Sequence, residues 1–229
     1  LSRADEVPLG LRSADALRRA GRSVDAADEL ARVAETSART EAERLRADAA
    51  RLYLAAGEMD RGRRLLEPLF ANVPRTELGA KLVLVRERVA LRIERLFERR
   101  SEIDRARLSA LQAVAEGLGM TDNLRGAIFH TRAVRLGLRS SDALLRGELL
   151  AIESIFAGAS GRKGRRRARK VIADAIAPFD GQVPPRLAAL IDSANAVNER
   201  CQRPSHANLA RFERCESFFE TSGAGDTWI

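Results

Sequence analysis

The chain has 229 residues, of which 45% are hydrophobic, 31% charged and only 4% aromatic. This composition excludes a disordered chain and provides enough length for a buried core. The net charge is +8, but seven positive charges lie in residues 161–170, so the rest of the chain is close to neutral and a globally basic surface is excluded.

The cysteine content and the lack of long apolar segments predict a cytoplasmic location. Cys201 and Cys215 are too few for a disulfide framework, and we expect a reducing cytoplasm. No apolar run approaches the length needed to span a bilayer, and the first residues lack the apolar segment of a signal peptide, so we expect no membrane contact. The sequence begins without Met, and we expect it to be part of a larger protein.

Helix is the secondary structure that the sequence favours. Ala, Leu, Arg and Glu dominate, and these residues lose little conformational freedom in a helix. Apolar residues recur at three- and four-residue steps along nearly the whole chain, and no segment shows the alternation of a strand. We therefore predict an all-α fold, an α-solenoid of antiparallel helical hairpins that is tetratricopeptide-like and forms a single array over residues 1–229.

Residues 1–73 are predicted to form two regular hairpins. Gly21 and Gly57 interrupt the helical spacing, 36 residues apart (57 minus 21), and a small residue, Ala26 or Gly62, lies five positions after each glycine. Tetratricopeptide repeats have a period of about 34 residues and pair two closely packed helices. Tyr53 is the best candidate for one of the aromatic positions of such a repeat.

Residues 74–158 are predicted to form longer, less regular helices. A long helix follows Pro74, a second ends at Gly117 or Gly119, and the last of this region closes near Gly158. Side chains that can cap a helix stand at the expected starts. These are Thr76, Ser101, Thr121 or Asp122, and Ser141 or Asp142.

Residues 159–221 are predicted to form further hairpins, and residues 222–229 a tail. One helix follows the basic segment, another opens at Pro184-Pro185, and the last covers residues 205–221. Four apolar residues of the last helix recur at three- and four-residue steps and are predicted to form a core stripe: Leu209, Phe212, Cys215 and Phe219.

The segment GRKGRRRARK, residues 161–170, is the densest charge in the chain. The favoured interpretation is a turn into an amphipathic helix whose cations are solvated. Its predicted apolar side consists of Ala168, Val171, Ile172, Ala175, Ile176 and Phe179. An acidic partner is the alternative, because cations near a helix N-terminus oppose the helix dipole. The patch for such a partner would comprise Arg162, Lys163, Arg165, Arg166, Arg167, Arg169 and Lys170.

Other ligands of this basic segment are less favoured. Nucleic acid is disfavoured because no aromatic residue is interleaved for base stacking and no helix-turn-helix pattern surrounds the run. A phosphate loop would need Gly-Lys-Ser/Thr after a strand, and the sequence has neither feature.

No catalytic, cofactor or metal site is predicted. Cys201, His206 and Cys215 lack the paired spacings and the fourth ligand of a structural zinc site, so we expect buried cysteines. The carboxylates lie in helical charge patterns that favour ion pairs on a solvated surface. No spacing groups a nucleophile with a base, so we expect a chain that is not an enzyme.

Four stretches carry a resemblance to a known class of protein. They are ADALRRAGRSVDAADELARVAE, RLRADAARLYLAAGEMDRGRRLLEPLF, LSALQAVAEGLGMTDNLRGAIFHTRAVRLGLRSSDALLRGELLAIES and LARFERCESFF. In this order the chain resembles the helical repeat region that follows the ATPase module in large bacterial serine/threonine protein kinases of myxobacterial and planctomycete type. The resemblance implies kinase and nucleotide-binding modules upstream of residue 1, and a basic, glycine-containing turn near residues 158–170.

These observations lead to an expected function. We expect a non-catalytic tetratricopeptide-like scaffold for protein–protein interaction, the sensor or regulatory region of a bacterial serine/threonine protein kinase. A protein or peptide partner would bind on its concave helical surface. The alternative is the helical repeat region of an ATPase-linked transcriptional activator whose DNA-binding parts lie elsewhere.

Overall fold

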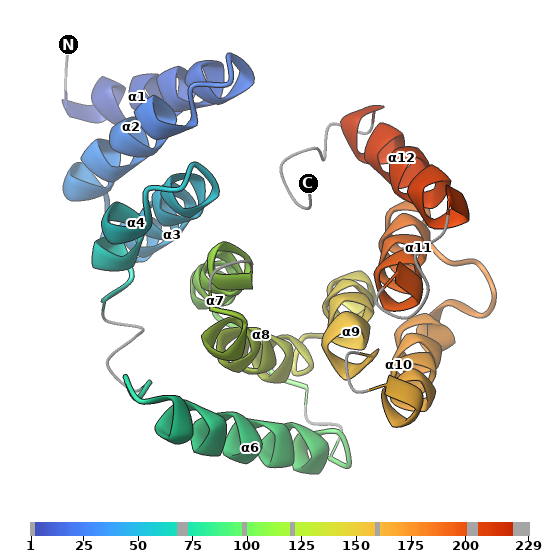
Figure 1. Ribbon diagram of the computed structural model, residues 1–229. Helices are drawn as coiled ribbons and strands as arrows, with labels where there is room; N and C mark the ends of the chain where they lie inside the picture. Colours follow the sequence, from blue (N-terminus) through green and yellow to red (C-terminus); the bar gives the residue numbers. More distant parts are fainter. Residues whose placement is uncertain are drawn as a thin grey trace. The chain divides into compact units, whose positions relative to one another are not determined.

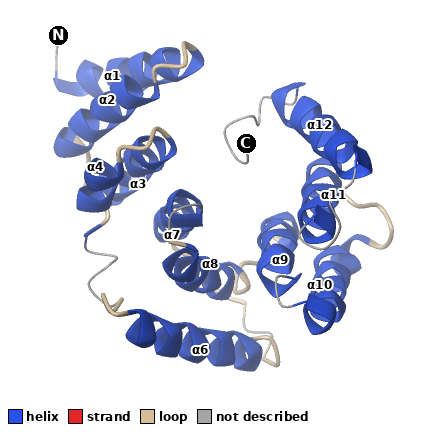
Figure 2. Ribbon diagram, viewed as in Figure 1, coloured by secondary structure: helices blue, strands red, loops and turns tan. Residues whose placement is uncertain are grey.

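The computed structural model describes residues 3–67, 73–97, 100–119, 122–158, 161–200 and 206–221 (Figure 1). The chain divides into two compact units, Leu1–Leu136 and Gly137–Ile229, which we describe one at a time. Every regular element in the described ranges is helical, eleven α-helices and one 3-10 helix without a strand, which confirms the all-α prediction (Figure 2). None of these helices combines the length and the apolar character needed to cross a membrane.

The first unit contains seven of the described helices. They are α1 (Arg3–Arg19), α2 (Ser23–Thr36), α3 (Arg39–Ala55), α4 (Met59–Leu65), α6 (Glu77–Glu94), α7 (Arg105–Gly119) and α8 (Asn123–Gly137), the last ending at the unit boundary. Helix α3 is central to this unit, because α2, α4 and α7 all pack against it.

The turns between the first helices are those that the sequence predicts. Gly21 and Gly57 have positive φ angles of 73° and 84°, a conformation that residues with a Cβ rarely adopt, and each ends a helical segment. Ala26 and Gly62 are both buried, as their spacing indicates. A Cβ at Gly62 would lie 2.6 Å from Cγ of Leu54, so α4 approaches α3 closely.

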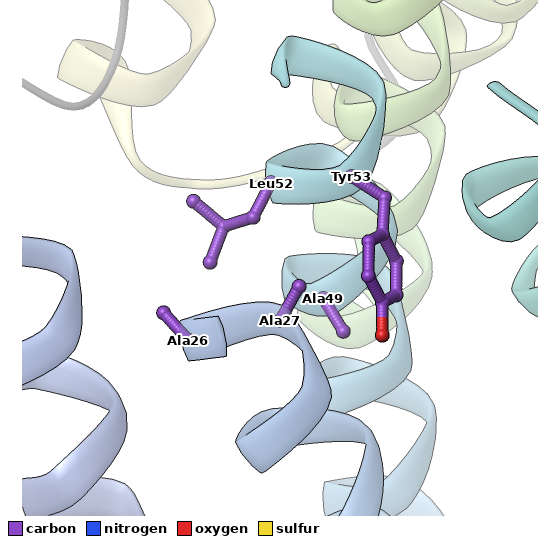
Figure 3. Close-up of a cluster of buried hydrophobic side chains, with 5 residues drawn as sticks. All are labelled: Ala26, Ala27, Ala49, Leu52 and Tyr53. Carbon is purple, nitrogen blue, oxygen red and sulfur yellow. The ribbon is translucent and has the colours of Figure 1, made fainter. Parts of the chain in front are cut away.

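Small residues also allow α2 and α3 to pack tightly. Figure 3 shows Ala26 and Ala27 of α2 beside Ala49, Leu52 and Tyr53 of α3, and all five are buried. Alanine at the contact brings the two helix backbones together, while the larger residues fill the space beside it. The tetratricopeptide-like stacking and the single array stay predictions.

Helix starts follow capping chemistry, with one error. Thr76 Oγ1 accepts a hydrogen bond from the backbone N–H of Gly79 (3.3 Å), and Asp122 and Asp142 cap α8 and α9 in the same way (both 3.1 Å). The prediction of a cap at Ser101 is wrong, because α7 begins at Arg105. Asp104 Oδ1 accepts from the N–H of Arg107 (2.9 Å), and its negative charge also interacts favourably with the helix dipole.

The second unit contains α9 (Ala143–Gly158), α10 (Gly161–Ile176), a 3-10 helix (Ala177–Phe179), α11 (Pro185–Arg200) and α12 (His206–Thr221). Helix α9 packs against α10 and α11, and α11 packs against α12. The start of α11 at Pro185 and the end of α9 at Gly158 confirm the predicted boundaries. Buried residues from α9, α11 and α12 form its core: Ala151, Leu187, Leu190, Cys215 and Phe219.

The predicted core stripe of α12 is partly wrong. Cys215 and Phe219 are buried, but Leu209 is 56% exposed and Asn208 is the buried residue of that turn. The buried side of α12 therefore runs through residues 208, 212, 215 and 219, a spacing that rotates Leu209 toward solvent. Cys201 and the predicted tail, residues 222–229, lie outside the described residues.

Candidate functional site: the basic surface of α10

The buried side of α10 is small and apolar. Gly164, Ala168, Val171 and Ala175 are buried at helical spacing. A Cβ at Gly164 would lie 2.7 Å from the carbonyl oxygen of Gly158, so this glycine lets the first turns of α10 pack directly on the end of α9. The predicted apolar side is thus confirmed at Ala168, Val171 and Ala175, whereas Ile176 is 36% exposed at its edge.

The opposite side of α10 is basic. We call the five exposed cations of this helix the basic surface: Arg165, Arg166, Arg167, Arg169 and Lys170. Their exposure agrees with the predicted solvated side of this helix, and their role as a patch for an acidic partner stays a prediction. Helix α10 begins at Gly161, so the basic segment is helical along its length, and the prediction of a turn there is wrong. The side chains of Arg162 and Lys163 lie outside the described residues.

The cations of the basic surface lack compensating carboxylates. Within the described residues none of the five forms an ion pair, and Asp174 is the only carboxylate on α10. Arginines in α1 and α3 behave differently: Arg18 and Arg44, for example, pair with carboxylates three positions away at 2.9 and 2.6 Å. These five cations lie along a helix length of only about 8 Å, so they leave a local excess of positive charge.

The chemistry of this surface favours an extended anionic ligand. Four of its five groups are guanidinium ions, which bind carboxylates with two parallel hydrogen bonds. Each exposed contact contributes only about 0.2–1 kcal/mol, so several carboxylates must bind at once for useful affinity. No aromatic side chain lies between these cations in residues 165–170, so the surface has no ring on which a nucleic-acid base could stack.

A second polar cluster, in the first unit, joins three helices. Tyr53 Oη of α3 donates a hydrogen bond to Asp28 Oδ1 of α2 (2.5 Å). Arg61 of α4 donates to both Asp28 and Tyr53 Oη, and its guanidinium carbon lies 4.3 Å from the centre of the tyrosine ring. Burial, followed by the hydrogen bond to Asp28, raises the pKa of Tyr53 to about 12. These contacts occupy the polar atoms with one another, so the cluster is structural.

The sequence does not predict the pKa shifts of two glutamates, the buried Glu87 and the half-buried Glu116. Burial raises the pKa of Glu116 in α7 to about 7, although the charge of Arg51 in α3 lowers it in part. For Glu87 in α6, burial alone would raise the pKa, but hydrogen bonds from Arg132 and Arg135 of α8 lower it below the ordinary value. Glu87 lies in charge-rich helical sequence typical of a solvated surface, and only long-range packing reveals its burial.

Neither glutamate belongs to a recognisable catalytic or metal centre. Among the described residues no three His, Cys, Asp or Glu side chains are grouped so that they could hold a metal ion. No protein-family model, curated protein or solved structure matches this chain. Of the features described so far, the basic surface of α10 is therefore the strongest candidate for function.

Proposed function

We propose that this chain is a non-catalytic, tetratricopeptide-like helical scaffold that binds an acidic protein segment through the basic surface of α10. In this proposal it is the regulatory region of a bacterial serine/threonine protein kinase, as the sequence resemblance implies. The observation that carries the proposal is the group of five exposed cations that have no ion pair within the described residues. Several arginines elsewhere in the described residues, among them Arg22, Arg32 and Arg186, pair with a carboxylate on their own or a neighbouring helix.

An acidic protein segment suits this surface better than nucleic acid does. The cations project from successive positions of one helix, between residues 165 and 170, and cover a short length of it. A duplex would engage phosphates over a longer basic surface, and single strands would use aromatic platforms. An extended run of Glu and Asp can match the cations locally, with bidentate hydrogen bonds to the four arginines.

Binding to a fluorescent hexaglutamate peptide, followed by anisotropy at low salt, tests the proposal. The triple variant R165Q/R166Q/R167Q is expected to bind at least about tenfold more weakly, since it removes three of the five cations. The control R19Q/R39Q/R64Q removes the same charge from exposed arginines outside α10 and is expected to bind like the wild type. Equal loss in both variants would show a non-specific charge effect and overturn the proposal.

Two further measurements separate this function from its alternatives. A duplex DNA that binds more tightly than the peptide, and loses binding in the α10 triple variant, would establish nucleic acid as the ligand. Reading the flanking coding sequence tests the parent protein: an upstream kinase domain supports the proposal, and a downstream helix-turn-helix domain supports the transcriptional activator instead.

A further inference from the structure

Helix α6 exposes a continuous row of large apolar side chains. We call this row the apolar stripe: Leu78, Leu82, Val85, Val89, Ile93 and Leu96, with Leu96 just past the helix end. Their exposed fractions run from 47% at Val89 to 79% at Leu96. At 100° per residue, the six positions fall within an arc of about 80° over five helical turns. Isolated exposed leucines are ordinary, but a row of six marks an interaction surface.

Ion pairs attach the opposite side of α6 to α8. Glu87 is only 4% exposed and accepts hydrogen bonds from Arg132 Nε of α8 (3.1 Å) and from Arg135. Arg135 also donates to both carboxylate oxygens of Glu94, at 2.9 and 2.8 Å. These ion pairs attach α6 to α8 on the side away from the stripe.

The chain before α6 is attached as well. Arg125 of α8 donates hydrogen bonds to the carbonyl oxygens of Pro74 (3.1 Å) and Arg75. Arg125 is itself oriented by Asp122. Helix α6 is thus fixed at its start and along its inner side without any contribution from the apolar stripe, so the fold of this unit does not explain why the stripe is apolar.

The residues beside the stripe define the charge of its partner. Lys81, Arg88 and Arg92 flank it on one side and Arg86 on the other, whereas Glu77, paired with Lys81 at 2.5 Å, is the one carboxylate beside it at the helix start. A second copy of α6 would place cations against cations, which disfavours a homodimer through this surface. A partner with apolar residues flanked by carboxylates would satisfy both features.

We propose that α6 is a docking helix for an amphipathic helix of a partner protein whose apolar seam is flanked by Asp and Glu. The narrow stripe suits helix-to-helix packing at about 8–10 Å between axes. A membrane surface fits less well, because a helix embedded in lipid needs a wider apolar side and α8 is attached to α6 by ion pairs. This inference goes beyond the proposed function, because it uses apolar contact on another helix and does not depend on the basic surface.

A designed helical peptide tests the docking helix. The probe has a leucine seam at positions i, i+4 and i+7 flanked by Glu, and its twin has Lys in place of Glu. The wild-type chain is expected to bind the Glu peptide at least about tenfold more tightly than the Lys twin. A dissociation constant for the Glu peptide above about 1 mM, or equal binding of the two peptides, would overturn the inference.

Substitutions assign the binding to the stripe. L82Q/V85Q/V89Q replaces exposed side chains, so circular dichroism is expected to be unchanged while the Glu peptide binds at least about tenfold more weakly. The control L9Q/L209Q changes similarly exposed leucines outside α6 and is expected to retain binding. The α10 triple variant is also expected to retain it, so failure of the proposed function leaves this result unchanged. Equal affinity of the stripe variant and the wild type would contradict the docking helix.

Two other ligands of the apolar stripe, a second copy of the chain and a lipid surface, would give different experimental results. A wild-type molar mass in solution that corresponds to a dimer, and falls to the monomer in the stripe variant, would replace the partner helix by a second copy. Stripe-dependent binding to vesicles of phosphatidylserine and phosphatidylcholine, without binding to either peptide, would replace it by a lipid surface.

Discussion

Helices α6 and α10 are both amphipathic, but their exposed sides differ: cations on α10 and large apolar residues on α6. Helix α10 buries Ala168 and Val171 and exposes five cations. Helix α6 buries Ala80, Leu91 and also Glu87, which pairs with two arginines of α8. It exposes five large apolar residues, and Leu96 follows just past its end. Each helix has the sequence period of an amphipathic helix, so the period does not reveal which side is inside. The neighbouring helix decides which side is buried. Helix α9 packs its backbone and small residues against α10, whereas α8 places guanidinium groups beside α6.

Removing the buried charge of α6 is expected to have the largest effect. Glu87→Ala leaves Arg132 and part of Arg135 without their carboxylate in a buried environment, which costs about 3–5 kcal/mol of unfolding free energy. Urea denaturation measures the change. Glu77→Ala, a substitution of the same type at an exposed position of the same helix, is expected to change the free energy by less than about 0.5 kcal/mol. Equal effects of the two variants would contradict the attachment of α6 to α8 through Glu87.

The same substitution in the two helices compares their outward and inward sides directly. Val171 of α10 is 2% exposed and Val89 of α6 is 47% exposed. Val171→Ala is expected to cost about 2 kcal/mol because it leaves a cavity against α9. Val89→Ala is expected to stay within about 0.5 kcal/mol of the wild type. Thermal or chemical denaturation of both variants measures the change in unfolding free energy. A loss of about 2 kcal/mol in Val89→Ala would show that the stripe is covered within the chain.

The close approach of α10 to α9 can be tested through its glycine. A Cβ at Gly164 would meet the backbone of α9 at 2.7 to 3.0 Å, so Gly164→Ala is expected to cost about 1–2 kcal/mol, although alanine favours helix. At Gly119, the last residue of α7, a Cβ would meet nothing within 4 Å. Gly119→Ala is therefore the matched control, and it is expected to be neutral in the same denaturation experiment.

The pH dependence of stability provides a further test, of a size similar to that of the glycine substitution. The folded chain holds a proton on Glu116 up to a pH of about 7, whereas the unfolded chain releases it near 4.5. The folded state therefore binds more protons between these values, and stability falls as the pH rises from about 4.5 to 7, by roughly 1–3 kcal/mol. Glu116→Gln is expected to flatten this part of the curve and to exceed the wild type in stability at pH 8. An unchanged slope would show that the pKa of Glu116 is not raised in the folded chain.

Local rules account for the features that the sequence predicts well. Thr76, Asp122 and Asp142 cap helices because the chemistry involves a side chain and an N–H only three residues away. The exposure of Arg165–Arg167 likewise follows from the spacing of the apolar residues around them. Ser101 shows the limit of this reasoning, since Asp104 offers a better cap a few residues later.

Contacts between distant segments are what the sequence does not predict. Glu87 and Arg132 are 45 residues apart, and nothing local to α6 indicates that this glutamate is buried while Leu82 and Val89 are exposed. The spacing from Leu78 to Leu96 does indicate an apolar row. Only the structure shows that the row faces outward, so the docking helix was missed and the basic surface was found. The prediction that Leu209 is buried is wrong for the same reason. Whether residue 208 or 209 is buried depends on how α12 packs against α11.

The cluster of Asp28, Tyr53 and Arg61 bears on how the first helices come apart. Its hydrogen bonds join residues 25 and 33 positions apart in the chain, so α2, α3 and α4 must all be in place before any of the three side chains has its full set of contacts. Opening one of these helices removes partners from the other two. We therefore expect the three helices to open as one cooperative unit, with backbone amides that exchange with solvent together and more slowly than those of a helix held by one neighbour.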